Sequence, residues 1–443
     1  MSGQAIRTTR SLTGWGDGLM SRVPIVPVAA GATLLACLDG IPGLDLQSLN
    51  VGGSFRYTDA CVGVLILLAG IRRLSERSVV TKPILRTYAW WGLTLAACWV
   101  LALYEAVSSG SSVFHAALYG RDFLYFAALA PIAAWLAVDD RELIALLTTV
   151  AVGTLAFTLA EIPAALGVVS ARIVNPDHVA AQGGITRIYT FMGNANLIDV
   201  VFSAALAVAL LAHGMRARLA AGVAGVCFIA ICLLLTRALY VGLVVSLATV
   251  MLVWGTMSPH SARVRRRLSR LLALVLITGV VVALADPAAV ATGVVGGIVS
   301  RVGGGVTEAT SGSGTVGIRE SVSGIMLRSL GDRWPLGLGF KDPTSYYVVG
   351  LPGGSLEDVD VAGLDSVVTM GALGTVVLFA PLLCAVVLVL ARARVAGKYD
   401  VLWLGAALWL VTALASALTL GAVESVTGIA TASVMLGLLA PRL

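Results

Sequence analysis

Residues 366–391 read SVVTMGALGTVVLFAPLLCAVVLVLA, a run of 26 residues without a charged side chain. About 20 consecutive apolar residues are enough for an α-helix to cross the hydrocarbon core of a bilayer. The run therefore predicts a membrane-spanning helix. The stretch before it, residues 285–366, is much more polar and is the only long segment that could not sit in lipid.

The rest of the chain resembles this run in composition. Of its 443 residues, 58% are hydrophobic and only 12% are charged, and the mean hydropathy is +0.93. Soluble globular domains carry about a quarter charged residues, so these values indicate a polytopic membrane protein. Twelve segments have the length and composition of spans: 23–39, 57–74, 84–105, 121–138, 141–162, 195–213, 217–235, 238–257, 268–286, 366–391, 400–420 and 423–441.

The distribution of basic residues predicts the orientation of these spans. Arginine and lysine cluster in the runs 72–86 and 263–270, which lie on the same side of the membrane as the N-terminus if the spans alternate. Basic residues mark the cytoplasmic side, so the N-terminus is expected in the cytoplasm and residues 287–365 outside it. The formal net charge of +6 then reflects topology, with no nucleic-acid partner expected.

The expected architecture is therefore all-α. It has about 12 transmembrane helices, nine within residues 1–286 and three within residues 366–443, with a large extracytoplasmic loop at 287–365 between helices 9 and 10. No dinucleotide or nucleoside-triphosphate motif is present, and no cofactor or metal is expected. A site outside the cytoplasm has no supply of ATP or nucleotide sugars, so a group donor there would be carried on a lipid.

One arginine departs from the orientation rule. Arg237 lies between two spans on the predicted external side, within LTRALY at 235–240. Its guanidinium could reach the lipid headgroups as a solvated side chain. Alternatively, its planar fork of donors matches the oxygens of a lipid-linked phosphate. Tyr240, one turn later, is a candidate for binding the sugar.

A second candidate stretch, RIYTFMGNAN at 187–196, precedes the sixth span. Arg187 is a further candidate for the donor phosphate. Gly193, Asn194 and Asn196 are typical of a loop ending in a helix cap. Asn194 or Asn196 could equally donate hydrogen bonds to a sugar, and both interpretations stay open.

The second half of the external loop holds the remaining candidates. Residues 318–330 have the apolar spacing of an amphipathic helix, with Arg319 and Glu320 near its start. A carboxylate there or just before span ten could accept the proton of an acceptor hydroxyl. The alternatives are a solvated acidic rim or a divalent-cation site. These carboxylates near span ten are Glu357, Asp358, Asp360 and Asp365.

Four stretches together resemble the O-antigen ligase and O-antigen polymerase family of bacterial membrane glycosyltransferases. They are RIYTFMGNAN at 187–196, LTRALYVG at 235–242, Arg319 with PLGLG at 335–339, and MGALGTVVLF at 370–379. They resemble the family's R…NxN entry to a span, its TxSRG hairpin, its R…PLxGxG loop and its GxxGxxxF span. The Ser and Gly of the hairpin are missing while its Arg remains, and Ser323 stands where the loop usually has Trp. The His-Asn or Asp-Asn pair of the family is missing, and Asp360 or Asp365 stands closest to its place.

The resemblance implies a fold of the glycosyltransferase C type in the bacterial inner membrane. It implies transfer of a sugar or glycan from a polyprenyl-phosphate or polyprenyl-diphosphate carrier to a hydroxyl of a glycan or glycolipid acceptor, without metal and with inversion. Arg187, Arg237 and Arg319 would bind the donor phosphate. Asp360, Asp365 or Glu320 would act catalytically, and Asn194, Asn196, Glu357, Asp358 and Tyr240 would bind the acceptor or sugar.

Two further expectations follow. The strong excess of Arg over Lys and the abundance of Ala, Val and Gly suggest an actinobacterial source, for which decaprenyl-phosphate-linked arabinofuranose is a candidate donor. The competing function is a polytopic transporter or a flippase for lipid-linked glycans. Inverted repeats and helices broken in mid-membrane would favour that alternative.

Overall fold

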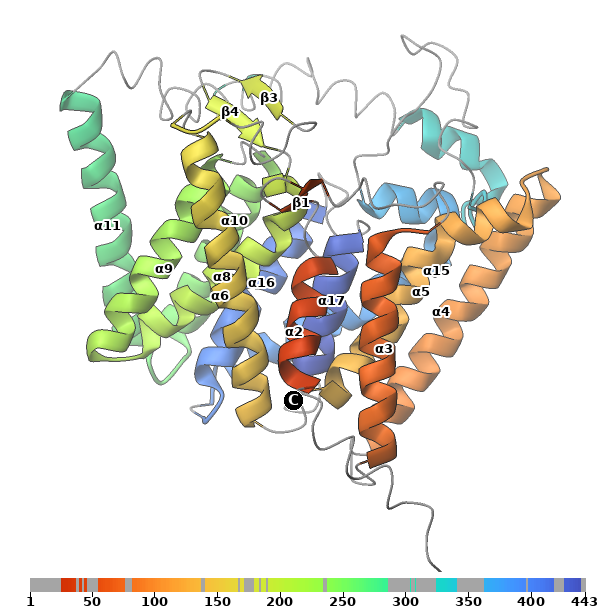
Figure 1. Cartoon of the computed structure of the whole chain (residues 1–443), viewed down its shortest axis with the longest axis horizontal. Helices are drawn as coiled ribbons and strands as arrows, with labels where there is room; N and C mark the ends of the chain where they lie inside the picture. The colour runs from red at the N-terminus through yellow and green to blue at the C-terminus, as the bar shows by residue number, and fades with distance from the viewer. Residues whose placement is uncertain are drawn as a thin grey trace, which may run out of the picture.

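The computed structural model describes a bundle of long helices (Figure 1). The described residues are 25–36, 40–41, 44–45, 55–75, 82–136, 140–165, 168–170, 179–182, 185–188, 190–233, 237–285, 303, 307, 324–340, 362–395, 397–417 and 426–439. Within them the main helices are α2 (Ile25–Ala36), α3 (Tyr57–Ser75), α4 (Lys82–Ser108), α5 (Val113–Leu136), α6 (Asp140–Ala165), α8 (Thr190–Leu211), α9 (Gly214–Leu233), α10 (Arg237–Thr256), α11 (Ser261–Ala285), α15 (Ala362–Arg392), α16 (Asp400–Ala417) and α17 (Val426–Leu439).

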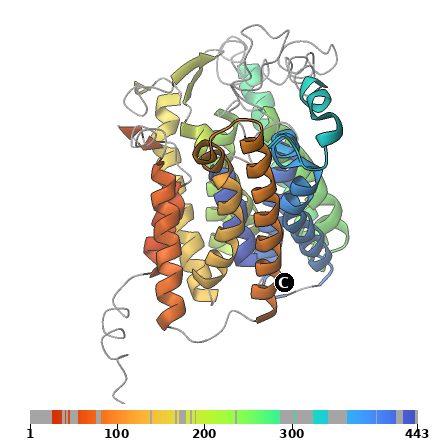
Figure 2. The ribbon, with the colours of Figure 1, turned by 90° about the vertical axis from the view of Figure 1, so that its right-hand side faces the viewer.

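The helical architecture expected from the sequence is confirmed. Each predicted span coincides with one of these helices, and the helices run roughly parallel to one another (Figure 2). Five are long and apolar enough to cross a membrane: Tyr88–Ser108, Asp140–Ala164, Gly214–Leu233, Leu239–Thr256 and Leu364–Arg392. Ile25–Ala36, Asn196–Leu211 and Asp400–Ser416 are shorter apolar helices. A membrane protein is indicated, while the number of spans and their orientation stay predictions.

Two short antiparallel hairpins accompany the helices. One pairs β1 (Gly40–Ile41) with β2 (Leu44–Asp45), and the other pairs β3 (Val179–Gln182) with β4 (Ile185–Ile188). In the second hairpin Ala180 lies opposite Arg187. The β3–β4 hairpin lies at one end of the bundle, next to α6 (Figure 1).

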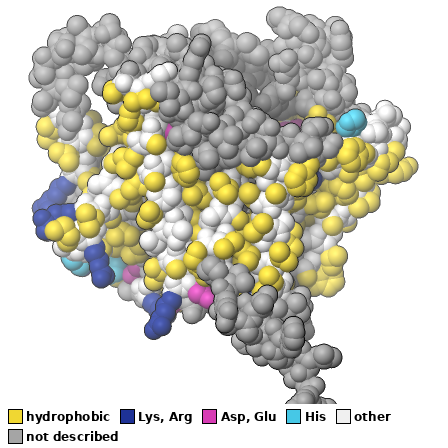
Figure 3. Space-filling model, viewed as in Figure 1, with side chains coloured by type: hydrophobic (Ala, Val, Ile, Leu, Met, Phe, Trp, Pro, Cys, Tyr) yellow, Lys and Arg dark blue, Asp and Glu magenta, His cyan; other side chains and the backbone are white. Residues whose placement is uncertain are grey.

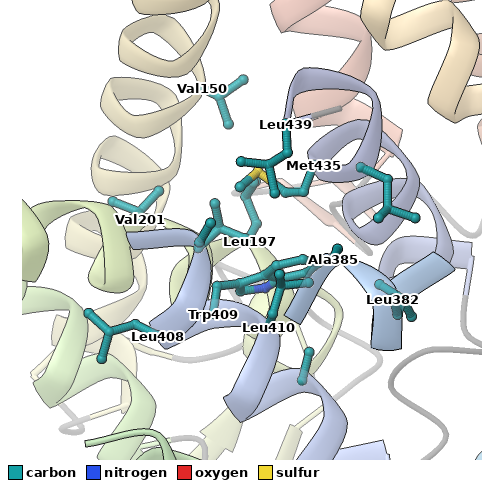
Figure 4. Packing of buried hydrophobic residues seen from close by; sticks show 14 of the residues in the cluster. Val150, Leu197, Val201, Leu382, Ala385, Leu408, Trp409, Leu410, Met435 and Leu439 are labelled. Atoms are coloured by element: carbon teal, nitrogen blue, oxygen red, sulfur yellow. The ribbon is translucent and has the colours of Figure 1, made fainter. Parts of the chain in front are cut away.

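The core is apolar and centres on α8, α16 and α17. The ring of Trp409 in α16 is fully buried. It lies close to Leu197 of α8 and is surrounded by aliphatic side chains (Figure 4). Helix α17 packs against α5 so closely that a side chain at Gly437 would overlap the Ala130 carbonyl. The hydroxyl of Ser433 also donates to the carbonyl oxygen of Phe126 over 2.8 Å.

The surface of the bundle carries an apolar band (Figure 3). On the face shown, lysine and arginine side chains gather at the lower end, and hydrophobic side chains cover the region above them. Arg267 of α11 donates to the carbonyl oxygens of Ala209, Leu210 and Ala212, at and just after the end of α8. Part of the basic run 263–270 therefore caps a helix.

Several predicted starts are wrong. Helix α11 begins at Ser261, seven residues before the predicted span at 268–286. Helix α5 begins at Val113, eight residues before the predicted span, because the charges of Arg121 and Asp122 are paired inside the bundle. Helix α8 begins at Thr190, so Asn194 and Asn196 lie within the helix and the loop-and-cap interpretation fails. Gly and Asn each cost a helix at most about 1 kcal/mol, which the packing of α8 against α9 and α16 offsets.

Candidate functional site

The third and fourth stretches of the family resemblance are bonded to each other. Helix α15 is interrupted at Gly371, whose φ of 71° and ψ of 179° are not helical. Residues 334–340, here called the latch, lie along this interruption. The amides of Leu338 and Gly339 donate to the carbonyls of Val368 and Thr369, over 2.7 and 3.0 Å.

On the other side of the break the direction of hydrogen bonding reverses. The amides of Ala372 and Leu373 donate to the carbonyls of Trp334 and Pro335, over 2.9 and 3.2 Å. The latch therefore donates to backbone carbonyls of α15 before the break and accepts from its backbone amides after the break. Non-helical backbone is tolerated at membrane depth only where its polar groups find partners, and the latch supplies them.

Glycine is required at three positions of this joint. Gly337, Gly339 and Gly371 have φ of 80°, 86° and 71°, a region that side chains other than glycine rarely adopt. A Cβ atom at Gly371 would overlap the carbonyl of Pro335, and one at Gly339 would overlap the backbone of Ala102 and Ala106 in α4. Gly337 and Gly339 thus allow the backbone of the latch to approach the backbones of α15 and α4.

Phe340 fixes the end of the latch in the bundle. It is 1% exposed and stacks on Phe123 of α5 with ring centroids 5.7 Å apart. Trp99 of α4 lies 5.9 Å away and donates its indole N–H to the carbonyl of Gly120 over 2.7 Å. The loop at 287–365 is therefore anchored to α4, α5 and α15 through its second half, where the sequence predicted the chemistry.

A network of charged residues lies on the same segment of α5. Arg56 pairs with Asp122 over 2.6 Å, and Arg121 pairs with Asp59 over 3.0 Å. Asp59 also accepts a hydrogen bond from the hydroxyl of Tyr125, over 2.8 Å. The sequence analysis did not predict these ion pairs. The adjacent opposite charges of Arg121 and Asp122 are the sequence feature that could have indicated paired charges inside the bundle.

The predicted site residues divide between described and undescribed parts of the chain. Asp365 lies in the first turn of α15, partly buried and beside the latch. The buried Ser366 follows it, and the hydroxyl of Thr375 reaches the Ser366 hydroxyl over 3.2 Å. Arg319, Glu320, Glu357, Asp358 and Asp360 lie outside the described residues.

The remaining candidates lie on α8, α10 and β4. Arg187 is in β4, Asn194 is in α8 and Arg237 is the first residue of α10, with backbones described but not side chains. Asn196 is partly buried on α8. Tyr240 donates its hydroxyl to the carbonyl of Cys232 over 2.6 Å, which makes it a cap for the end of α9.

These helices are joined by α16. Both α8 and α10 pack against α16, and α16 in turn packs against α15. The third and fourth stretches are thus in direct contact, and helices α8 and α10, which carry the first and second, reach α15 through one helix. Among the residues the structure describes, no group of three or more His, Cys, Asp or Glu side chains is placed to hold a metal ion.

No protein-family model matches the chain, and no curated protein matches it significantly.

Proposed function

We propose that this protein is a cell-envelope glycosyltransferase of the O-antigen ligase and polymerase type. It transfers a sugar or glycan from a polyprenyl-phosphate or polyprenyl-diphosphate carrier to a glycan hydroxyl, on the extracytoplasmic face of the bacterial inner membrane. The observation that carries the proposal is the joint between the latch and Gly371. Two stretches that resemble the same family, far apart in sequence, form one structural unit.

The proposed chemistry is a displacement at the anomeric carbon. The acceptor oxygen attacks C1 of the donor sugar, the bond from C1 to the phosphate oxygen breaks, and the lipid phosphate leaves with the electron pair. Arg187, Arg237 and Arg319 would hold this phosphate and stabilise its growing charge. The proton of the acceptor hydroxyl would pass to a carboxylate, for which Asp365, Asp360 and Glu320 are the candidates.

Asp365 is the carboxylate for which the structure offers support. It lies in the first turn of α15, and the next turn contains Val368 and Thr369, whose carbonyls are bonded to the latch. A general base must be held within hydrogen-bond reach of the proton it takes. A helix end fixed by the latch meets that requirement.

The competing function is a transporter or flippase, and one observation bears on it. A helix broken inside the membrane is typical of transporters, because its freed backbone groups bind substrate or ions. Helix α15 is broken at Gly371, but the amides of Ala372 and Leu373 and the carbonyls of Val368 and Thr369 are bonded to the latch. This arrangement favours a structural joint over an ion site.

Transfer by the purified protein tests the proposal. The wild type would be reconstituted in vesicles with a polyprenyl-phosphate-linked labelled sugar and a glycan acceptor. Arg237→Ala and Asp365→Asn are expected to lose at least about 100-fold in rate, the usual loss when a charge-stabilising or proton-accepting group is removed. Arg328→Ala, which changes an exposed arginine in the loop at 287–365, is the control. Full activity of Arg237→Ala would exclude Arg237 as a ligand of the donor phosphate. Movement of the lipid across the membrane without sugar transfer would favour a flippase.

A further inference from the structure

Exposed arginines that the proposed function does not use gather where α8 ends and α9 and α11 begin. They come from two segments about 50 residues apart in sequence. Arg216 and Arg218 lie in the first two turns of α9, and Arg266 and Arg270 lie in the first three turns of α11. All four side chains are exposed, and together they are called the arginine patch.

The end of α8 brings these two segments together. Arg267 of α11 donates to the carbonyl of Ala212, and its guanidinium lies 3.4 Å from Nδ1 of His213, in the turn that leads into α9. Arg266 precedes Arg267 in the chain, and Arg270 follows it by three residues, on a neighbouring part of the helix surface. The first turns of α9 and α11 therefore lie on either side of one contact.

No acidic side chain balances the patch in the described part of the chain. Residues 200–285 contain eight arginines and neither Asp nor Glu. The ion pairs of the described residues include no member of the patch. Asp400, at the start of α16, is bonded to His260 and to the amide of Gly397. The patch is thus a surface of uncompensated positive charge.

This charge is unfavourable for the helices that carry it. Like charges four residues apart on a helix, such as those of Arg266 and Arg270, repel each other. Positive side chains in the first turns of a helix also oppose its dipole, and neither α9 nor α11 has an acidic residue in its first turn. An anion bound at the patch would offset both effects.

The turns of α11 that follow the patch are apolar and uncovered. Helix α11 stands at the edge of the bundle (Figure 1). Residues 272–277 are all exposed, and six consecutive helical residues point in every direction around the axis. Leu274 and Ile277, which are 61% and 60% exposed, follow Arg270 by four and seven residues and share its face. A ligand of the patch therefore meets apolar surface directly beside its anionic group.

We propose that the arginine patch binds the headgroup of an anionic phospholipid, whose acyl chains pack on Leu274 and Ile277. The planar guanidinium groups match the oxygens of a phosphodiester, and basic sites between helices at the cytoplasmic end are typical of such headgroups. A free anion would leave the apolar face of α11 uncovered, whereas a phospholipid supplies both the charge and the hydrocarbon. The site does not depend on the glycosyltransferase proposal.

Binding of defined lipids to the whole protein in a non-ionic detergent tests the site. Bound lipid is counted by native mass spectrometry during titration with phosphatidylglycerol or with phosphatidylcholine of the same acyl chains. Phosphatidylglycerol is expected to bind at least about tenfold more tightly, because only its headgroup carries a net negative charge. Glycerol phosphate and polyprenyl phosphate are added as competitors at the same concentration and should not displace it.

Two double variants separate a local site from the overall charge of this end of the bundle. Arg216→Gln combined with Arg270→Gln should weaken phosphatidylglycerol binding about 30-fold, at about fivefold for each arginine. Arg265→Gln combined with Arg394→Gln removes the same charge from two exposed arginines outside the patch and should bind as the wild type does. Arg265 is a matched control because it lies in the same run but on the side of α11 that faces Gly255 of α10.

Each of the other outcomes contradicts the site. Equal affinity for the two phospholipids overturns the proposal, and this result does not depend on any variant. An equal loss in both double variants also overturns it, because binding would then follow overall charge. Displacement by glycerol phosphate or polyprenyl phosphate would assign the patch to a free phosphate or to the lipid carrier. If the patch variant does not fold, Arg218→Gln combined with Arg266→Gln replaces it, with the same expected loss.

Discussion

The amide of Gly339 donates a hydrogen bond to the carbonyl of Thr369 over 3.0 Å, which joins the latch to the backbone of α15. The contact lies one turn after Asp365 and next to the break at Gly371. The latch therefore does two things: it satisfies the backbone of a broken helix, and it holds the helix end that carries a candidate base.

The joint predicts a strong effect of alanine at Gly371. The new Cβ would overlap the carbonyl of Pro335 in a backbone conformation that alanine rarely adopts. We expect Gly371→Ala to lose more than about 1 kcal/mol of stability, measured by thermal unfolding in detergent. Gly222→Ala is the matched control, because nothing lies within 4 Å of a side chain there. It should be neutral or stabilising by up to about 1 kcal/mol. Equal stability of both variants would contradict the joint.

Phe340 predicts a packing effect on the loop. Removing this buried ring from its place against Phe123 and Trp99 should cost about 3–5 kcal/mol in Phe340→Ala and clearly less in Phe340→Leu. Release of the latch should also raise the rate of proteolysis between residues 341 and 361. Trp334→Ala, which truncates a side chain that is 59% exposed, serves as control. Similar cleavage rates in Phe340→Ala and wild type would show that Phe340 does not anchor the loop.

The charge network predicts a measurable coupling between Arg56 and Asp122. Their side chains are 27% and 17% exposed and lie 2.6 Å apart, so solvent screens them only partly. A double-mutant cycle to alanine should give a coupling of about 1 kcal/mol or more. The same cycle on Arg333 and Glu105, which are 3.8 Å apart with Arg333 58% exposed, should give less than about 0.5 kcal/mol. Indistinguishable couplings would mean that the network does not secure α5 to α3.

The predicted orientation can be tested by labelling single cysteines. In a background with all six native cysteines replaced by alanine, Ser109→Cys marks the turn between α4 and α5, and Met257→Cys marks the turn after α10. A membrane-impermeant maleimide added to intact cells should label Ser109→Cys and should reach Met257→Cys only after the membrane is opened. The reverse pattern would invert the topology and place the candidate site in the cytoplasm.

Much of the fold could be predicted because hydrophobic length is a local property. Each predicted span corresponds to a helix, since a segment such as residues 366–391 has few other ways to satisfy its backbone in lipid. The predicted helix at 318–330 is present over its described part, 324–330, with Met326 and Leu330 buried as its apolar spacing suggested.

The start of α5 and the start of α8 could not be predicted, because both depend on tertiary contacts. Arg121 and Asp122 look like the end of a span until their partners, Asp59 of α3 and Arg56 just before it, are known. Gly193, Asn194 and Asn196 favour a cap locally, but packing extends the helix through them. The latch was visible only as a Pro-Gly turn, since its meaning lies in backbone bonds to residues about 30 positions away.

The most direct test of the account is sugar transfer by the purified wild type in vesicles containing a labelled polyprenyl-phosphate sugar. The account predicts that label moves from lipid to glycan acceptor, that transfer persists in excess EDTA, and that it is lost in Arg237→Ala but not in Arg328→Ala. The account would be contradicted if the protein binds and translocates polyprenyl-phosphate and polyprenyl-diphosphate lipids but transfers sugar from none of them.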